Sequence, residues 1–236
     1  MFDHVTIRVS DLAASRAFYL EALGLPTNDG EFVEWDAFGV SLGDDVSRHL
    51  HVGFAVPDRD AVDAWWNRLT EAGYESDGEP GPRAVYSPSY YGAFVLDPDG
   101  NSIEAVHHER TPGSGIDHIW LRTRDVAAAR RFYTTVAPIV GIRLAVDEPD
   151  QISFRFADER GGFTFVTGDE STHNVHLAFG VGDEATVARF HETATAAGYA
   201  DNGPPGERPE YHPGYHGAFV LDPDGHNVEA VFHDRP

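Results

Sequence analysis

The stretch GAFVLDPDG occurs twice without a change, at residues 92–100 and at residues 217–225. Nine identical residues repeated 125 positions apart indicate an internal duplication of the chain. In each copy, strand-forming residues precede a turn with Pro at its second position and Gly at its end, and a second apolar run follows. The stretch therefore predicts one β-hairpin in each half of the chain.

Each predicted hairpin carries a glutamate on its second strand. Glu104 and Glu229 stand four residues after the Gly that closes the turn, between apolar neighbours. A lone Glu in such a strand most often lies on the solvated face of a half-buried sheet. Its recurrence at the same place in both copies favours a shared function instead.

A second repeat surrounds the hairpins. The pattern His, aliphatic, any, apolar, any, Val or Thr, any, Asp occurs four times, opening at His4, His51, His118 and His176. The alternation predicts a strand, and the closing Asp predicts the N-cap of a helix, as for residues 12–25 and 59–74. Further strand-like stretches follow each helix. The sequence thus predicts an α+β fold of four βαβββ modules.

The duplication also predicts the domain organisation. We expect two tandem domains, residues 1–110 and 116–236, joined by a short flexible linker at 111–115 with the sequence TPGSG. Each domain is long enough to bury a core of its own. The two modules of a domain are expected to form a curved, mostly antiparallel sheet.

Composition excludes several classes of function. The 236 residues carry a net charge of −22, which opposes binding to nucleic acid or to an anionic membrane. The first residues lack the features of a signal peptide, so we expect a cytoplasmic protein. The chain has no Cys and all 17 basic residues are Arg, which excludes thiolate chemistry and every mechanism that needs a lysine.

The repeated histidines suggest a metal site. In the first strand, Val5 and Ile7 alternate with His4 and Thr6, so His4 lies on the face opposite the helices. If the two modules of a half sit side by side in one curved sheet, two His and one Glu converge on its concave face. Such a facial triad suits Fe(II) and also holds Zn(II), Mn(II) or Ni(II). Most of the remaining histidines are expected at the surface or the rim.

The paired βαβββ modules, the His that opens each first strand, and the DPDG turn followed by Glu resemble the vicinal oxygen chelate superfamily. This superfamily includes glyoxalase I, extradiol dioxygenases and bleomycin-resistance proteins, and the chain resembles its tandem glyoxalase-like members. The resemblance implies metal ligands at His4, His51, Glu104, His118, His176 and Glu229.

The resemblance leaves the pairing of the modules open. Pairing within a half joins His4 to His51 and Glu104, whereas pairing between halves joins His4 to His176 and Glu229. We expect pairing within each half.

The number of ligands bears on the reaction. Glyoxalase I uses a fourth ligand, a Glu on the last strand of a module, but the matching stretches GVSLGD and GFTFVTG have no carboxylate in their middle. The three-ligand pattern implies dioxygenase-type or addition chemistry on a small substrate chelated through adjacent oxygens, without an organic cofactor. The alternative is a bleomycin-resistance-like protein that sequesters an antibiotic or metabolite. A metalloenzyme of the dioxygenase or lyase/isomerase class, monomeric or homodimeric, is expected.

Other polar and aromatic residues are candidates for substrate contacts. The loops before the hairpins carry four tyrosines that donate a hydrogen bond to a metal-bound oxygen, act as general acids, or only cap the loop: Tyr86, Tyr90, Tyr211 and Tyr215. Arg8 and Arg122 are candidates for binding an anionic group. Trp120 is positioned to stack on a planar ligand.

Overall fold

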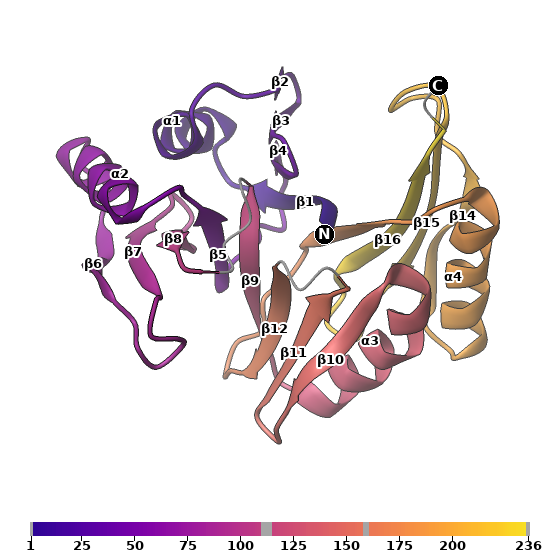
Figure 1. The fold of residues 1–236 in the computed structure, drawn as a ribbon. Coiled ribbons are helices and arrows are strands. Elements are labelled where there is room, and N and C mark those ends of the chain that lie inside the picture. The colour runs from indigo at the N-terminus through magenta and orange to yellow at the C-terminus, as the bar shows by residue number, and fades with distance from the viewer. Residues whose placement is uncertain (1, 110–114, 158–160, 235–236) are drawn as a thin grey trace.

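The computed structural model describes residues 2–109, 115–157 and 161–234 (Figure 1). The predicted linker lies outside these residues except for Gly115. The first module comprises β1 (Phe2–Val9), α1 (Leu12–Leu23), β2 (Asn28–Asp29), β3 (Phe32–Trp35) and β4 (Phe38–Leu42). The second comprises β5 (Leu50–Ala55), α2 (Arg59–Glu71), β6 (Ser76–Pro82), β7 (Tyr91–Leu96) and β8 (Ser102–His107).

The second half repeats this order. The third module comprises β9 (Ile116–Thr123), α3 (Val126–Val140), β10 (Ile142–Asp147), β11 (Gln151–Phe156) and β12 (Gly162–Thr167). The fourth comprises β13 (His176–Gly180), α4 (Glu184–Ala196), β14 (Ala200–Glu207), β15 (Tyr215–Leu221) and β16 (Asn227–His233). The predicted α+β fold of four βαβββ modules is confirmed. No helix in the described part of the chain is long and apolar enough to cross a membrane.

The Asp that closes each repeat begins a helix. Its side chain accepts hydrogen bonds from backbone N–H groups of the first helical turn at all four N-caps: Asp11, Asp58, Asp125 and Asp183. Such a cap contributes about 1 kcal/mol to stability. The predicted start of each helix is therefore confirmed.

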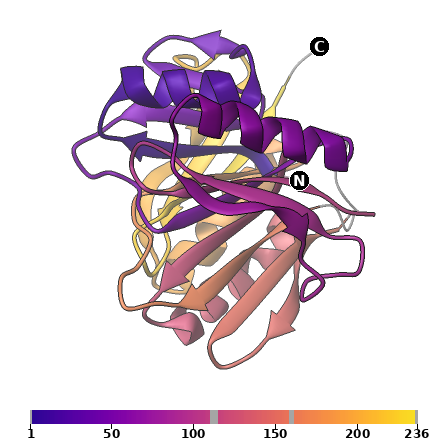
Figure 2. The same cartoon turned by 90° about the vertical axis from the view of Figure 1, so that its left-hand side faces the viewer.

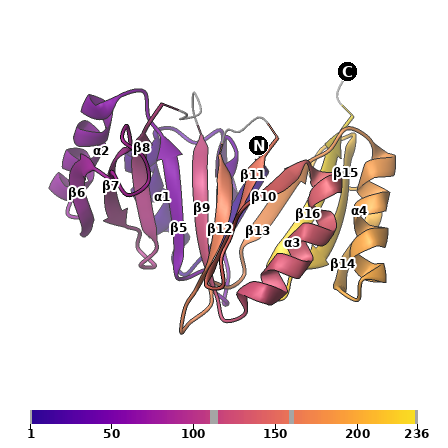
Figure 3. The same cartoon turned by 60° about the horizontal axis from the view of Figure 1, so that its bottom comes forward.

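The two sheets combine modules from different halves. The first sheet has the order β14-β15-β16-β13-β1-β4-β3-β2 and joins the first module to the fourth. The second has the order β10-β11-β12-β9-β5-β8-β7-β6 and joins the third module to the second (Figure 3). Most neighbouring strands are antiparallel, as expected. The expected pairing within each half is wrong.

Two kinds of contact produce this exchange: strand edges pair between the halves, and helices pack against each other within a half. Antiparallel pairing of β1 with β13 places Thr6 opposite His176, and β5 pairs in the same way with β9, placing His51 opposite Trp120. Within a half, the modules meet through their helices instead. Figure 2 shows α1 and α2, in indigo and purple, side by side.

The DPDG turn also links the two modules of a half. The Asp97 carboxylate accepts hydrogen bonds from the backbone N–H groups of Asp99 and Asn101, and from the Tyr19 hydroxyl of α1 at 2.9 Å. Tyr133 of α3 donates in the same way to Asp222 in the second turn at 3.0 Å. The duplicated stretch therefore serves both as a hairpin turn and as a tie to the first helix of its half.

One hydrophobic core spans both sheets. The ring of Phe2 on β1 contacts Phe156 on β11 at a centroid distance of 4.9 Å, and Phe38 on β4 contacts Phe54 on β5 at 5.2 Å. These aromatic contacts join the helix-facing sides of the two sheets, so the two sheets share one core.

Candidate metal centres

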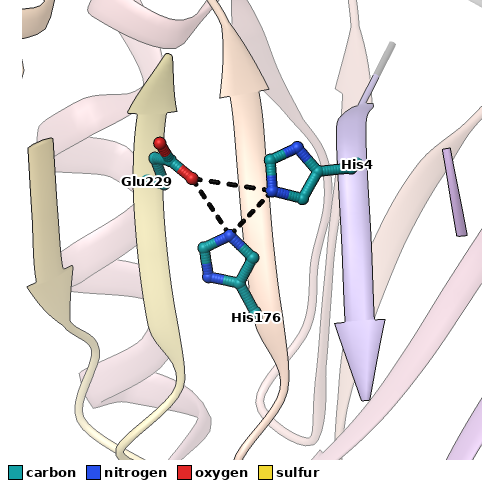
Figure 4. A group of neighbouring side chains, drawn as sticks. All are labelled: His4, His176 and Glu229. Carbon is teal, nitrogen blue, oxygen red and sulfur yellow. Dashed lines mark hydrogen bonds and ion pairs between the residues drawn. The ribbon is translucent and has the colours of Figure 1, made fainter. Parts of the chain in front are cut away.

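The first centre consists of His4 on β1, His176 on β13 and Glu229 on β16. Figure 4 shows the three side chains pointing toward one another from these strands. The two Nε2 atoms lie 3.0 Å apart, and the Glu229 Oε2 atom lies 3.0 Å from His176 Nε2 and 3.6 Å from His4 Nε2. One module thus supplies one imidazole, and the other supplies an imidazole and a carboxylate.

The second centre consists of His51 on β5, Glu104 on β8 and His118 on β9. Its two Nε2 atoms also lie 3.0 Å apart, and the Glu104 Oε2 atom lies 3.2 Å from His51 Nε2 and 3.3 Å from His118 Nε2. The six residues singled out in the sequence therefore gather in two triads. Each triad is mixed between the halves, which corrects the expected grouping of His4 with His51 and Glu104.

These distances fit an ion held by all three side chains. Ligand atoms about 2.1 Å from an ion lie about 3.0 Å apart at right angles and about 3.4 Å apart at tetrahedral angles. The separations in both centres fall close to this range, and the three donor atoms of each centre lie within 4.8 Å of one another. Both triads suit Fe(II), Zn(II), Mn(II) or Ni(II).

The two carboxylates are buried. Glu104 is 0% exposed and Glu229 is 1% exposed, in contrast to the usual place of Glu on a half-buried strand. Each lies against a Gly of the neighbouring strand, because a Cβ atom at Gly92 or Gly217 would collide with the Oε1 atom of the carboxylate. This close approach explains the Gly that opens the stretch GAFVLDPDG.

Each buried carboxylate is held by a tyrosine. The Tyr90 hydroxyl donates to both oxygens of Glu104 at 3.0 and 2.9 Å, and the Tyr215 hydroxyl donates to Glu229 Oε1 at 2.8 Å. Burial and the adjacent carboxylate raise the pKa of both tyrosines far above its usual value. Both phenols therefore remain protonated, and in this geometry they fix the orientation of a metal-ligand candidate.

One histidine of each centre is held by the Asp that precedes it. His4 Nδ1–H donates to Asp3 at 2.8 Å, and His118 Nδ1–H donates to Asp117 at 2.8 Å. This bond leaves the Nε2 lone pair facing the centre. On its other side, Asp3 lies 2.9 Å from the His233 ring.

A similar contact lies behind the second centre. The His108 Nε2 atom is 3.1 Å from Asp117. His108 and His233 are half-buried parts of these networks, and His226 is fully buried. His226 is an exception to the expectation that most of the remaining histidines lie at the surface or the rim. Its Nδ1 atom accepts a hydrogen bond from the backbone of Val175.

The electrostatics of the centres favour positive charge. Burial opposes the charged form of His118, but hydrogen bonds to Asp117 and Glu104 outweigh it and raise the His118 pKa to about 9. In the same way, Asp3 and Glu229 outweigh burial and raise the His4 pKa. Burial lowers the pKa of the second imidazole of each pair, His51 or His176. Each centre thus carries two imidazoles of unequal basicity beside one carboxylate.

The other predicted residues lie around the centres. Tyr86 and Tyr211 are 53% and 57% exposed, and the Tyr86 ring lies 6.0 Å from the Trp120 ring. The Arg8 guanidinium donates to Ser41. Arg122 is exposed.

The residues behind the ligands were not predicted from the sequence. The Asp before His4 and the Asp before His118 were visible as the dipeptide Asp-His at both places. The spacing of 14 residues between tyrosine and glutamate also recurs. These two repeats were the available signals. Glu34, on the cavity wall of the first centre, was also missed because it has no counterpart in the repeat.

Comparison with known proteins decides the family. The model of the Glyoxalase/Bleomycin resistance protein/Dioxygenase superfamily matches residues 1–105 and 115–230. The chain belongs to this superfamily. No curated protein matches the sequence.

Solved structures of the superfamily share the fold over nearly the whole chain. Glyoxalase I from Zea mays is 24% identical with a TM-score of 0.70, covering 98% of this chain and 92% of that one. A putative dioxygenase from Bacillus subtilis is 14% identical with a TM-score of 0.68, covering 99% of this chain and 85% of that one. At this identity the likeness establishes the fold of a glyoxalase-superfamily protein, and the reaction has to be argued from the centres.

Proposed function

We propose that the protein is a metal-dependent enzyme with two three-ligand centres, acting on a small substrate that chelates the ion through two adjacent oxygens. The observation that carries this proposal is the pair of triads, each with two Nε2 atoms and one carboxylate oxygen at ligand spacing. His4, His176 and Glu229 would hold one ion, and His51, Glu104 and His118 the other. A bound divalent ion supplies Lewis acidity and, if it is iron, activation of dioxygen.

The residues around each ion have separate tasks in this proposal. Asp3 keeps the Nδ1 proton on His4 in the first centre, and Asp117 keeps it on His118 in the second. Tyr90 and Tyr215 hold the carboxylate so that one oxygen faces the ion. Because both hydroxyls donate to the carboxylates, Tyr90 and Tyr215 act as positioning residues. Tyr86 and Tyr211 remain the tyrosines assigned to donate to the substrate.

The number of ligands favours dioxygenase-type or addition chemistry over that of glyoxalase I. Three protein ligands on an octahedral ion leave three positions, enough for a bidentate substrate and dioxygen or water. No carboxylate stands on β4 or β12, where a fourth ligand is expected in glyoxalase I. The first centre also faces a cavity of about 1060 Å³, which is large enough for such a substrate.

Metal analysis tests the first part of the proposal. The protein is expected to bind two divalent ions per chain, and Glu104→Ala and Glu229→Ala are each expected to remove one. Ion binding that survives both substitutions would exclude the triads. For the reaction, the protein is loaded anaerobically with Fe(II) and oxygen uptake is followed with a panel of catechols. No uptake, together with turnover of a hemithioacetal by the Zn(II) or Ni(II) form, would reverse the ranking.

A second candidate function is ligand binding without turnover, as in bleomycin-resistance-like proteins. The exposed Tyr86 ring beside Trp120 favours it, since such rings stack on planar ligands. Tight binding of a planar antibiotic that is unaffected by removal of the metal would support this alternative.

A further inference from the structure

The cavity of the first centre is strongly acidic. It is lined by Asp3, Glu31, Glu34, Asp36, Glu210 and Glu229, and by a single guanidinium, that of Arg8. With histidines counted as neutral, these side chains carry a net charge of −5. Two positive charges on a bound divalent ion would not cancel this charge. A ligand that enters the cavity therefore meets a negative field.

Glu34 is the acidic residue best placed to act on a ligand at the ion. Strand register sets Thr6 opposite Gly39 and Gly39 opposite Glu34, so Glu34 lies two strands away from β1. A Cβ atom on Gly39 would lie 3.4 Å from the Glu34 Cγ atom and 3.3 Å from the Thr6 hydroxyl. The Glu34 side chain therefore extends over Gly39 toward β1, on the face that carries His4.

The Glu34 carboxylate is not neutralised by the protein. It accepts a hydrogen bond from the Asn28 amide at 3.0 Å, and within the described residues it forms no ion pair. Arg8 forms no ion pair with Glu34 within the described residues, because its guanidinium donates to Ser41 and lies over the Phe32 ring.

The second centre provides an internal comparison. The register of β9, β12 and β11 sets Trp120 opposite Thr164 and Thr164 opposite Ser153, so Ser153 corresponds to Glu34. Ser153 and Thr164 are hydrogen-bonded to each other at 2.8 Å. Two residues further along the chain, Asp36 follows the end of β3 in the first sheet, and the residue two positions after Ser153 is Arg155 on β11. A carboxylate that faces the first centre is thus replaced by a hydroxyl, and a second one by a guanidinium.

The difference in charge extends to the other positions that correspond between the two centres. At the second centre, Val85 occupies the position that corresponds to Glu210, and Asp77 the position that corresponds to Asn202. The charged residues at the positions that match the first cavity are Asp77, Glu104, Asp117, Arg122, Asp150 and Arg155. Their net charge is −2, against −5 for the first cavity. The acidity of the first cavity is therefore not a uniform property of this acidic chain.

From this asymmetry we infer that the first centre selects a ligand that carries a positive charge, such as an ammonium group, beside its two chelating oxygens, and that Glu34 is the residue that selects it. The inference rests on the proposed metal-dependent function and adds the charge class of the substrate at one of the two centres. Glu34 acts as a specificity residue through the charge of the ligand, and small Thr6 and Gly39 leave the space for it.

Equilibrium binding tests this without turnover. Glu104→Ala leaves only the first centre, which is loaded with redox-inert Zn(II). Isothermal titration calorimetry then compares dopamine, which is cationic, with 3,4-dihydroxyphenylacetate, which is anionic and of similar size. We expect dopamine to bind at least tenfold more tightly. Glu34→Gln should reduce the ratio of the two affinities about tenfold, the effect of one nearby charge in a partly solvated cavity.

Two controls separate the charge of Glu34 from other effects. Glu192→Gln removes one charge from the exposed face of α4 and should leave the ratio unchanged. Glu229→Ala, which leaves only the second centre, should give a smaller ratio. An unchanged ratio of affinities in Glu34→Gln overturns the inference but not the proposed function. Tighter binding of the anionic catechol to the first centre does the same. A protein that binds no Zn(II) overturns the proposed function as well.

Discussion

Replacing Tyr90 by Phe tests how strongly the buried tyrosine holds the second centre. The substitution removes one hydroxyl that donates to both oxygens of Glu104 and leaves the ring in place. Glu104 is 0% exposed, so water cannot supply the missing donor. A hydrogen bond to a charged group contributes about 1.5–3 kcal/mol, and loss of a residue behind a metal ligand weakens metal binding about 10- to 100-fold. Since a tenfold change in affinity corresponds to about 1.4 kcal/mol, the two ranges agree.

Competition for Zn(II) with a chromophoric chelator measures this effect. Tyr90→Phe is expected to weaken one of two binding sites by about 10- to 100-fold and to leave the other unchanged. Tyr91→Phe is the matched control, because the neighbouring hydroxyl donates to Asp63 on α2 instead. If Tyr90→Phe and Tyr91→Phe bind both ions as tightly as the unmodified protein, the carboxylate does not depend on Tyr90 and the reasoning fails.

Three further predictions follow from the fold. His4→Ala combined with Glu229→Ala should lose one ion, no more than either change alone, whereas His4→Ala with Glu104→Ala should lose both; equal losses in the two double variants, counted by metal analysis, would contradict the mixed triads. Gly100→Ala should lower the free energy of unfolding by about 1 kcal/mol, because Gly100 has φ 84° and no crowding; denaturant unfolding with Gly182→Ala as control tests it, and equal midpoints would argue against the turn. Hydrogen bonds from Thr186 lower the pKa of Asp183, so the stabilisation from this cap is present above about pH 4 and is lost as the pH falls; Asp183→Asn should flatten the acid side of the stability profile, and an unaltered profile would refute the link.

The sequence was sufficient to predict the modules and the residues that gather in the centres. Alternation in the strands placed His4 opposite Val5, and the repeated Asp predicted the N-caps, because both depend on neighbours along the chain. On α2, however, Trp65 is buried and its neighbour Trp66 is only partly buried. The two rings are adjacent in sequence, and which one faces the core depends on the packing of the whole helix.

The pairing of modules could not be predicted in this way. The edge of β1 is compatible with β5 and with β13, since both strands carry the same repeat with its His. The choice depends on contacts between distant segments, such as Phe2 with Phe156. The contact of Tyr90 with Glu104 and that of His108 with Asp117 also depend on the final approach of separate segments. Only their recurrence in both halves was visible beforehand.

The exchange of modules between halves has a consequence for how a newly made chain matures. Synthesis proceeds from the N-terminus, so His51 and Glu104 wait only for β9, which supplies His118. His4 is made before the other five ligands, but its centre stays incomplete until β16, which supplies Glu229, leaves the ribosome. The ligand residue that is synthesised first thus belongs to the centre that is completed last. Ion uptake during synthesis should accordingly begin at the second centre, and a chain truncated before β16 should retain that centre alone.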